Sequence, residues 1–185
     1  MGENKIKVIA INGTSGGGKT TIINELLRRI PKSKALYFDD RDYASESGIF
    51  DLCKWEEDGW DMSLWNLQAL ADDIKSLMKE MKEELDYIFL DYPFGYMQEQ
   101  ISGFIYLSIY LDTPLDIAMA RRILRDFKDK SVTDIMNEMD WYLEKGRKTY
   151  TRRLEYGHAD ADLIVDGSRT LDVVCSIIVE VLKRV

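Results

Sequence analysis

The sequence predicts an α/β fold in which a parallel sheet of five strands is covered by helices on both faces. Short apolar segments alternate with longer segments of helical periodicity along the 185 residues. Neither an internal repeat nor a Pro/Gly-rich linker divides the chain. Crossover connections through helices make neighbouring strands parallel and place the helices on the faces of the sheet. We therefore expect one domain over residues 1–185.

Five short apolar segments are predicted to form the strands, and they cover residues 6–11, 35–38, 87–90, 104–111 and 163–165. Apolar residues at helical spacing predict the helices. These helices cover residues 19–30, about 62–85, 114–125, about 132–154 and 171–182. Pro31 is expected to end the first helix and Pro114 to begin the third, because proline lacks the N–H group that a helix interior needs.

The composition is that of an ordinary globular protein, with 45% hydrophobic and 31% charged residues. Lys and Arg number 25 against 33 Asp and Glu, which gives a net charge of −8. This acidic balance argues against a protein that mainly binds nucleic acid or anionic membranes. The chain has no apolar run of membrane-spanning length, one histidine and two cysteines outside any CxxC pair. We expect a cytoplasmic protein without a histidine-based triad or metal site.

A glycine-rich segment follows the first predicted strand and precedes the first predicted helix. It matches the phosphate-binding pattern G-x-x-x-x-G-K-[ST] in full. The residues are Gly13, Thr14, Ser15, Gly16, Gly17, Gly18, Lys19 and Thr20, followed by Thr21. Glycines let backbone N–H groups surround a phosphate, and the positive end of the helix faces the same anion. Lys19 is expected to reach the β- and γ-phosphates and Thr20 to ligate Mg²⁺.

This context of strand before and helix after predicts that the chain binds ATP with Mg²⁺ rather than matching the pattern by chance. A GTPase should also carry an N-K-x-D motif, but the Asn4-Lys5 pair is followed by Lys7 where Asp is required. A mechanical ATPase usually brings further modules, for which this chain has no room. A small-molecule kinase instead needs a carboxylate near the γ-phosphate.

Carboxylates follow two of the predicted strands at the ends where an α/β sheet binds its ligands. Asp39 and Asp40 come after the second strand, and Asp91 ends the third. Asp39 is placed to accept the proton of an acceptor hydroxyl, Asp40 to contact the substrate, and Asp91 to hold Mg²⁺. The alternative for each is an aspartate that begins a turn or caps a helix.

Three arginines cluster on the helix that follows the fourth predicted strand. Arg121 and Arg125 are four residues apart and share one face, whereas Arg122 is displaced around the helix. They are expected to close over the triphosphate and to offset charge as the phosphoryl group moves. Alternatively, they form a solvent-exposed face paired with Asp126 or Asp129.

These motifs, taken in order, resemble the uridine kinase and nicotinamide riboside kinase family of P-loop kinases. The resemblance rests on the phosphate-binding loop, the strand ending in Asp-Asp, the long helix, the strand ending in an acid and the Arg-Arg-Ile-Leu-Arg-Asp segment. A segment from Ala161 to Gly167 is also similar to the family. The family implies a three-layer α/β/α sandwich with a helical lid, here at roughly 121–150. It implies ATP-dependent phosphorylation of a small-molecule hydroxyl, typically that of a nucleoside.

The resemblance also assigns roles by position. Asp39 matches the family's general base, Asp61 an aspartate that holds ribose hydroxyls, and Asp91 a metal-associated acid. The family's lid arginines are matched by Arg121, Arg122 and Arg125. Without the resemblance, Asp61 is simply a good N-cap for the helix predicted from about residue 62.

Aromatic residues are the candidates for an acceptor pocket. Tyr43, Trp60 and Tyr92 are predicted to contact the substrate, because rings near the phosphate site can stack on a planar base. Further candidates are Phe50, Trp55, Trp65, Phe94 and Tyr96. Each ring can equally be packing in the core, and Trp65 more so because it falls inside a predicted helix.

The sequence therefore predicts a small-molecule kinase that uses Mg-ATP and a nucleoside-like acceptor. Lys19, Arg121 and Arg125 would stabilise the transferring group, and Asp39 would orient the acceptor. The alternatives are a kinase for a sugar-like or pantothenate-like alcohol, an NTP-hydrolysing switch, and a nucleotide-binding module without activity. Either a monomer or a homo-oligomer fits the sequence.

Overall fold

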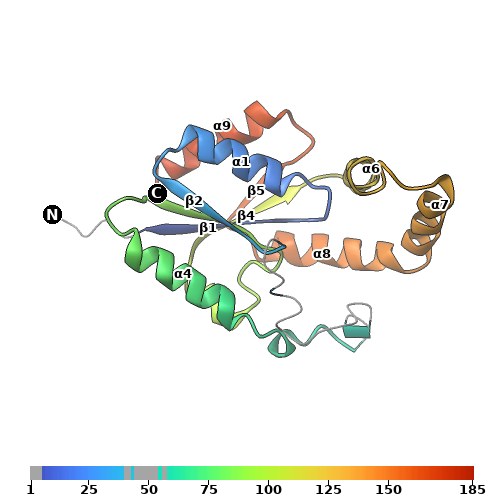
Figure 1. The fold of residues 1–185 in the computed structure, drawn as a ribbon, viewed down its shortest axis with the longest axis horizontal. Helices are drawn as coiled ribbons and strands as arrows, with labels where there is room; N and C mark the ends of the chain where they lie inside the picture. Colours follow the sequence, from blue (N-terminus) through green and yellow to red (C-terminus); the bar gives the residue numbers. More distant parts are fainter. Residues whose placement is uncertain (1–5, 40–42, 44–53, 56–57) are drawn as a thin grey trace.

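The computed structural model, drawn in Figure 1, describes residues 6–39, 43, 54–55 and 58–185. Five parallel strands form one sheet in the order β2-β3-β1-β4-β5. The strands are β1 (Lys7–Gly13), β2 (Ser33–Tyr37), β3 (Tyr87–Asp91), β4 (Ile105–Asp112) and β5 (Leu163–Asp166). Asp91 is in register with both Ile11 and Tyr37. The segments that leave β1, β2 and β3 therefore begin at one edge of the sheet.

Helices cover both faces of the sheet, as predicted. Figure 1 shows α1 (Lys19–Arg29) and α9 (Leu171–Leu182) on one face and α4 (Gln68–Glu80) and α8 (Arg147–Ala159) on the other. The alternation of side chains along β1 explains this arrangement. Ile9 and Ile11 are fully buried under α1 and α9, while Val8 and Ala10 are fully buried on the opposite face. The three-layer sandwich with a five-stranded parallel sheet is thus confirmed.

The helix predicted over about 62–85 is shorter than expected. A 3₁₀ turn, η1 (Met62–Leu64), comes first, and α4 begins only at Gln68. The Asp61 carboxylate accepts hydrogen bonds from the Ser63 N–H at 2.9 Å and the Ser63 hydroxyl at 2.6 Å. The Leu67 N–H donates to the Gln100 side chain at 2.7 Å. These bonds to local and distant side chains replace helical hydrogen bonds between residues 61 and 68.

The helix predicted over about 132–154 also differs, because it is interrupted. The segment consists of α7 (Val132–Trp141), a π-helical turn η2 (Tyr142–Gly146) and α8. The path of the chain turns a corner between α7 and α8 (Figure 1). The Trp141 ring lies so close to Gly146 that a Cβ atom there would be 2.5 Å from it. A local π turn accommodates this change of direction.

The remaining helices are α5 (Glu99–Ser102), which the sequence did not predict, and α6 (Leu115–Asp126), which begins after Pro114 as expected. In Figure 1, α6 and α7 project beyond the sheet and α8 returns to it. These helices and the turns between them include residues 121–150, for which the sequence predicts a lid. In the part of the chain that the structure describes, no helix is both long enough and apolar enough to cross a lipid bilayer.

Candidate active site

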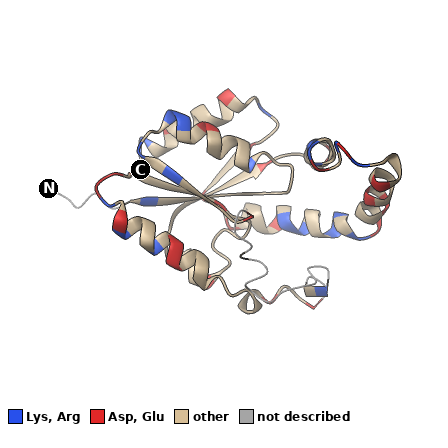
Figure 2. Ribbon diagram, viewed as in Figure 1, with Lys and Arg blue, Asp and Glu red and all other residues tan. Residues whose placement is uncertain are grey.

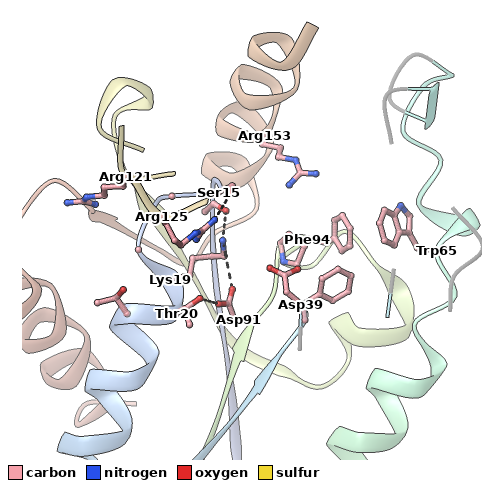
Figure 3. A pocket seen from close by; sticks show the side chains of 16 residues that line it. Ser15, Lys19, Thr20, Asp39, Trp65, Asp91, Phe94, Arg121, Arg125 and Arg153 are labelled. Atoms are coloured by element: carbon pink, nitrogen blue, oxygen red, sulfur yellow. Dashed lines mark hydrogen bonds and ion pairs between the residues drawn. The ribbon is translucent and has the colours of Figure 1, made fainter. Parts of the chain in front are cut away.

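A cavity of about 520 Å³ lies at the edge of the sheet where β1, β2 and β3 end (Figure 3). Residues from the glycine-rich loop, from the ends of β2 and β3, and from α6 and α8 line it. They are Gly13, Ser15, Gly16, Gly18, Lys19, Thr20, Thr21, Phe38, Asp39, Trp65, Asp91, Pro93, Phe94, Arg121, Arg125 and Arg153. Most of the residues predicted to handle phosphate are therefore brought together.

The glycine-rich loop has the backbone conformation of a phosphate cradle. Gly16 (φ 79°) and Gly18 (φ 103°) adopt the left-handed region, which side chains other than glycine rarely enter. The Gly17 N–H donates to the Thr14 carbonyl at 3.0 Å, and the Thr113 hydroxyl donates to the Gly17 carbonyl at 2.9 Å. Thr14 is buried behind the loop. The backbone is therefore held in place by the protein itself.

Lys19, at the start of α1, directs its ammonium group back over this loop. The Nζ atom donates to the carbonyls of Gly13 at 3.2 Å and Thr14 at 3.4 Å, and lies 3.8 Å from Asp91 Oδ1. Burial lowers the pKa of Lys19 from its ordinary value, and the nearby carboxylates of Asp91 and Asp39 oppose that change. The ammonium is thus largely desolvated and available to a strong anion.

The predicted metal ligands lie next to each other. The Thr20 hydroxyl donates to Asp91 Oδ2 at 2.6 Å, and Asp91 is buried at the end of β3. Hydroxyl and carboxylate oxygens are the donors that Mg²⁺ prefers, and it commonly binds one or two carboxylates together with substrate phosphates. The chemistry of this pair therefore fits a magnesium ion.

Asp39 lies in the turn directly after β2, exposed and facing the cavity across from Lys19 (Figure 3). Its influence on the pKa of Lys19 shows that the two groups are within electrostatic reach. The predicted position of a carboxylate facing the phosphate cradle agrees with this arrangement. Asp40 lies outside the described residues.

The three arginines of α6 separate into two groups. Arg121 and Arg125 line the cavity, with Arg121 Nη1 donating to the Gly167 carbonyl at 3.2 Å and Arg125 Nη2 donating to the Ser15 hydroxyl at 3.4 Å. A hydrogen bond from Arg125 lowers the pKa of Asp126. Lys and Arg gather on α8, whereas Asp and Glu lie along α4 and α7 (Figure 2).

Arg122 does not line the cavity, which differs from its predicted role in nucleotide binding. Its Nη1 atom forms an ion pair with Glu138 of α7 at 2.6 Å, and its Nε atom lies 3.7 Å from Asp126. One residue along a helix rotates a side chain by about 100°. Arg122 therefore faces α7 while Arg121 and Arg125 face the glycine-rich loop.

Arg153 of α8 is a cavity residue that sequence reasoning missed (Figure 3). It is within electrostatic reach of Lys19, whose pKa it helps to lower. The chain offered one signal, the adjacent Arg152-Arg153 pair in a predicted helix. That signal does not say which face of the helix meets the cavity, because Arg153 and Lys19 line the same cavity although they are 134 positions apart in the sequence.

Aromatic rings form the wall of the cavity opposite the glycine-rich loop. Phe38, Trp65 and Phe94 lie close together, with ring centroids 6.1 Å apart for Phe38–Trp65, 5.8 Å for Phe38–Phe94 and 4.8 Å for Trp65–Phe94. Trp65 was predicted to be a packing residue within a helix. It follows the 3₁₀ turn rather than lying in a helix, but it is buried in the core as predicted and also lines the cavity.

Four of the residues predicted to contact the substrate are described by the structure and do not line the cavity, namely Tyr43, Trp60, Asp61 and Tyr92. Tyr43 is buried and its hydroxyl donates to Asp73 at 2.6 Å. Tyr92 is fully buried between the sheet and Phe94, and burial raises the pKa of its phenol well above the ordinary value. Both rings belong to the core that supports the wall, which is the alternative that their aromatic character left open.

Trp60 and Asp61 also lie outside the lining of the cavity. Trp60 is buried against Trp55, at 4.9 Å between ring centroids. The Asp61 carboxylate caps η1, and its hydrogen bonds to Ser63 lower its pKa. The structure therefore places Asp61 as an N-cap, although of a 3₁₀ turn rather than of the long helix expected from the sequence.

A second cavity of about 220 Å³ adjoins the first. Gly18, Thr21 and Arg121 line both. The second cavity is otherwise lined by Gly17, Ile22, Gly167, Arg169, Leu171 and Val174. The second cavity extends from the glycine-rich loop toward the loop after β5. The two cavities together therefore fit an elongated ligand with an anionic middle and an apolar end.

Comparison with known proteins identifies relatives over most of the chain. The model of the Phosphoribulokinase / Uridine kinase family matches residues 65–174. A uridine kinase of Borrelia hermsii is 30% identical over 179 residues, which cover 86% of this chain and 86% of the relative. A uridine kinase of Clostridium tetani is 22% identical over 200 residues, covering 96% of this chain and 94% of the relative.

Solved structures with the same fold include shikimate kinase from Aquifex aeolicus, with a TM-score of 0.51 and 18% sequence identity. The alignment covers 95% of this chain and 96% of that one. TT1252 from Thermus thermophilus has a TM-score of 0.55 and 19% identity, covering 97% of this chain and 98% of that one. These similarities confirm the P-loop α/β fold.

Proposed function

Because the chain belongs to the phosphoribulokinase / uridine kinase family, we propose that it transfers the γ-phosphoryl group of Mg-ATP to a hydroxyl group of a nucleoside-like acceptor. Membership of the family makes it a phosphotransferase that acts on a hydroxyl group. The observation that carries the finer proposal is the meeting of Lys19, Asp39 and Asp91 in one cavity of about 520 Å³.

The phosphates of ATP would lie in the glycine-rich loop, between the backbone N–H groups and the Lys19 ammonium. The positive end of α1 points to the same place. The adjoining cavity would hold the adenine base between the loop after β5 and the start of α9. Arg121, which lines both cavities, would then lie alongside the bound nucleotide.

The acceptor would lie between Asp39 and the aromatic wall. Its hydroxyl oxygen forms a bond to the γ-phosphorus while the bond from that phosphorus to the β-bridging oxygen breaks. Asp39 orients the hydroxyl and accepts its proton, and ADP leaves. Lys19, Arg125 and Arg153 stabilise negative charge on the transferring group from three sides.

Thr20 and Asp91 would hold the magnesium ion. The ion, when bound, neutralises charge on the β- and γ-phosphates. The Thr20 hydroxyl already donates to Asp91 Oδ2, so both oxygens can face a cation after the hydroxyl proton rotates away. Asp91 ends β3 beside Ile11 of β1, and Thr20 lies in the first turn of α1, so the fold itself places the two side chains next to each other.

Phe38, Trp65 and Phe94 are at most 9% exposed and offer the acceptor a small apolar contact rather than a free ring face. This apolar contact supports an acceptor with a planar apolar part, such as a nucleoside. A non-nucleoside alcohol remains the second candidate, since the Asp61 carboxylate, for which the resemblance implies ribose binding, bonds Ser63 and does not line the cavity. We further propose a single domain over residues 1–185 with the lid at roughly 121–150.

The test is an ADP-release screen with Mg-ATP and a panel of nucleosides, nicotinamide riboside, pantothenate and simple sugars. Replacing Asp39 with Asn should lower kcat by a factor of about 10²–10⁴ while the KM for ATP changes by less than about twofold. Asp129→Asn provides a matched control, because Asp129 is exposed on the lid segment and does not line the cavity.

Equal turnover of Asp39→Asn and wild type would remove Asp39 from the mechanism. ATP hydrolysis that no acceptor stimulates would instead support the NTP-hydrolysing switch. Phosphorylation of a sugar or of pantothenate, but of no nucleoside, would replace the nucleoside proposal with the second candidate.

A further inference from the structure

Two neighbouring arginines of α8 contact different parts of the molecule. Arg153 lines the cavity. The Arg152 guanidinium carbon instead lies 5.0 Å from the centroid of the Trp60 ring and 5.6 Å from that of Tyr156. Arg152 Nη2 also donates to the Tyr156 hydroxyl at 3.3 Å. Arg152 is therefore held between two rings, one of which comes from a segment 92 positions earlier.

Trp60 is the first member of a continuous series of aromatic contacts. Its ring centroid lies 4.9 Å from that of Trp55, which lies 5.5 Å from that of Trp65. Trp65 then contacts Phe94 at 4.8 Å. We call Trp60, Trp55 and Trp65 the tryptophan series. It connects α8 to the aromatic wall of the cavity, because Trp65 and Phe94 both line that wall.

The backbone of Trp60 adopts a conformation that a bulky residue rarely takes. Its φ angle is 65°, in the left-handed region, and Gly59 before it has φ 109°. The Trp60 N–H donates to the Trp55 carbonyl at 3.2 Å, and Trp55 Nε1 donates to the Asp61 carbonyl at 2.8 Å. Surrounding contacts must hold such a residue in place. The buried ring against Arg152 is one of those contacts.

We propose that Arg152 is a positioning residue for phosphoryl transfer, acting through Trp60 on the aromatic wall and through α8 on Arg153. This inference rests on the proposed function, because it concerns the acceptor side of the same cavity. Arg152 and Arg153 are consecutive in one helix, so a displacement of Arg152 from the rings also displaces Arg153. The contact therefore fixes the distance between the lid and the acceptor wall.

Loss of this contact has a specific kinetic consequence. The acceptor wall and Arg153 would lose their fixed separation, which lowers kcat and raises the KM for the acceptor. The glycine-rich loop is built by β1, α1 and α6, with no contribution from Arg152. The KM for ATP should therefore stay within about twofold of wild type. If Arg152 had only a structural role, replacing it would change the fraction of folded enzyme and leave both KM values unchanged.

The first experiment measures kcat and both KM values for Arg152→Met with Mg-ATP and uridine, or with the nucleoside that wild type uses best. Loss of a cation–π contact that is partly exposed to solvent accounts for a decrease in acceptor kcat/KM of about 2- to 5-fold. Arg152→Lys keeps a cation over the rings and should recover part of this loss. Arg147→Met, on the same helix, serves as the matched control, because Arg147 lines a separate groove beside α6 and α7 and does not line the cavity.

The second experiment tests the contact itself, without any acceptor. Arg152→Met, Trp60→Phe and the double variant are compared by urea unfolding, and the two single losses should not add, because Arg152→Met removes the cation and Trp60→Phe weakens the ring that this cation contacts. If the losses of unfolding free energy in the two single variants add up in the double variant, Arg152 and Trp60 do not interact and the proposal is overturned. Because Trp60→Phe keeps a ring, it provides a folded variant in which the acceptor KM should still rise.

The outcomes separate the two proposals. If the wild type is active and Arg152→Met has the same acceptor KM and kcat, the positioning role is overturned and the proposed function stays intact. An equal rise in the KM values for ATP and acceptor would also overturn it. A wild type that phosphorylates none of the nucleosides would overturn the proposed function, and the positioning role with it.

Discussion

Replacing Gly16 with Ala tests how the phosphate cradle is built. Gly16 has φ 79°, and a Cβ atom there would lie 2.0 Å from the Ala118 carbonyl oxygen and 3.2 Å from Arg122 Cβ. The left-handed conformation costs alanine about 1–2 kcal/mol. Overpacking against the α6 backbone costs about 1–3 kcal/mol more. We expect a loss of about 2–5 kcal/mol, a large part of a typical stability of about 5–15 kcal/mol.

The assay is urea unfolding followed by ATP kinetics on the folded variant. With a slope of about 2 kcal/mol per molar urea, the midpoint should fall by about 1–2.5 M. The close approach of Gly16 to Ala118 also sets the distance from the loop to the arginines of α6. Because a Cβ atom would push α6 away, the KM for ATP should rise as well.

Gly103→Ala is the matched control for this substitution. Gly103 has φ −66°, and no atom lies within 4 Å of a Cβ placed there. Alanine at such a site leaves stability unchanged or raises it by up to about 1 kcal/mol. A Gly16→Ala enzyme with the wild-type urea midpoint and the wild-type KM for ATP would refute the reasoning.

Two further predictions concern the lid and the core. Gly146→Ala should destabilise the protein by about 1–3 kcal/mol because its Cβ would meet the Trp141 ring at 2.5 Å, and Trp141→Ala in the same chain should reduce that loss in thermal unfolding. Burial raises the pKa of the Cys175 thiol to about 11, so the native protein binds this proton more tightly and stability should fall as the pH rises from about 9 to 11. In a Cys53→Ser chain at pH 8, Cys175 should react with a disulfide reagent far more slowly in the native state than in urea; equal rates would contradict its burial.

The strands and the phosphate cradle were predictable because their signals are local. An apolar run such as 87–90 is buried wherever a parallel sheet places it, and the residues that follow it reach the same edge of the sheet as those that follow β1. The glycine-rich motif carries its own context of strand before and helix after. Asp39 and Asp91 could be placed from chain position alone, since Asp91 ends β3 and Asp39 lies in the turn directly after β2.

The limits of helices were less predictable because distant groups determine them. The Gln100 side chain accepts the Leu67 N–H and thereby fixes the start of α4, although the apolar pattern continues before it. Similarly, Gly146 lies under the Trp141 ring and allows a π turn, which the periodicity of apolar residues does not predict. Periodicity reports which face of a segment is apolar, not where its hydrogen bonds end.

The acceptor wall was the least predictable part of the site, because an aromatic residue gives the same sequence signal in a core as in a pocket. Tyr43 and Tyr92 proved to support the wall, and Trp65 proved to be part of it. Only the path of the chain between η1 and α4 distinguishes these roles. Arg153 was missed for a related reason, because the face of α8 that meets the cavity depends on the corner after α7.

The overall charge of the chain is also a poor guide to its site. The net charge is −8, yet the cavity is lined by four cationic side chains, Lys19, Arg121, Arg125 and Arg153, against the carboxylates of Asp39 and Asp91. A polyphosphate therefore meets a locally positive site on an acidic protein, and the same acidic exterior opposes binding of an extended nucleic acid.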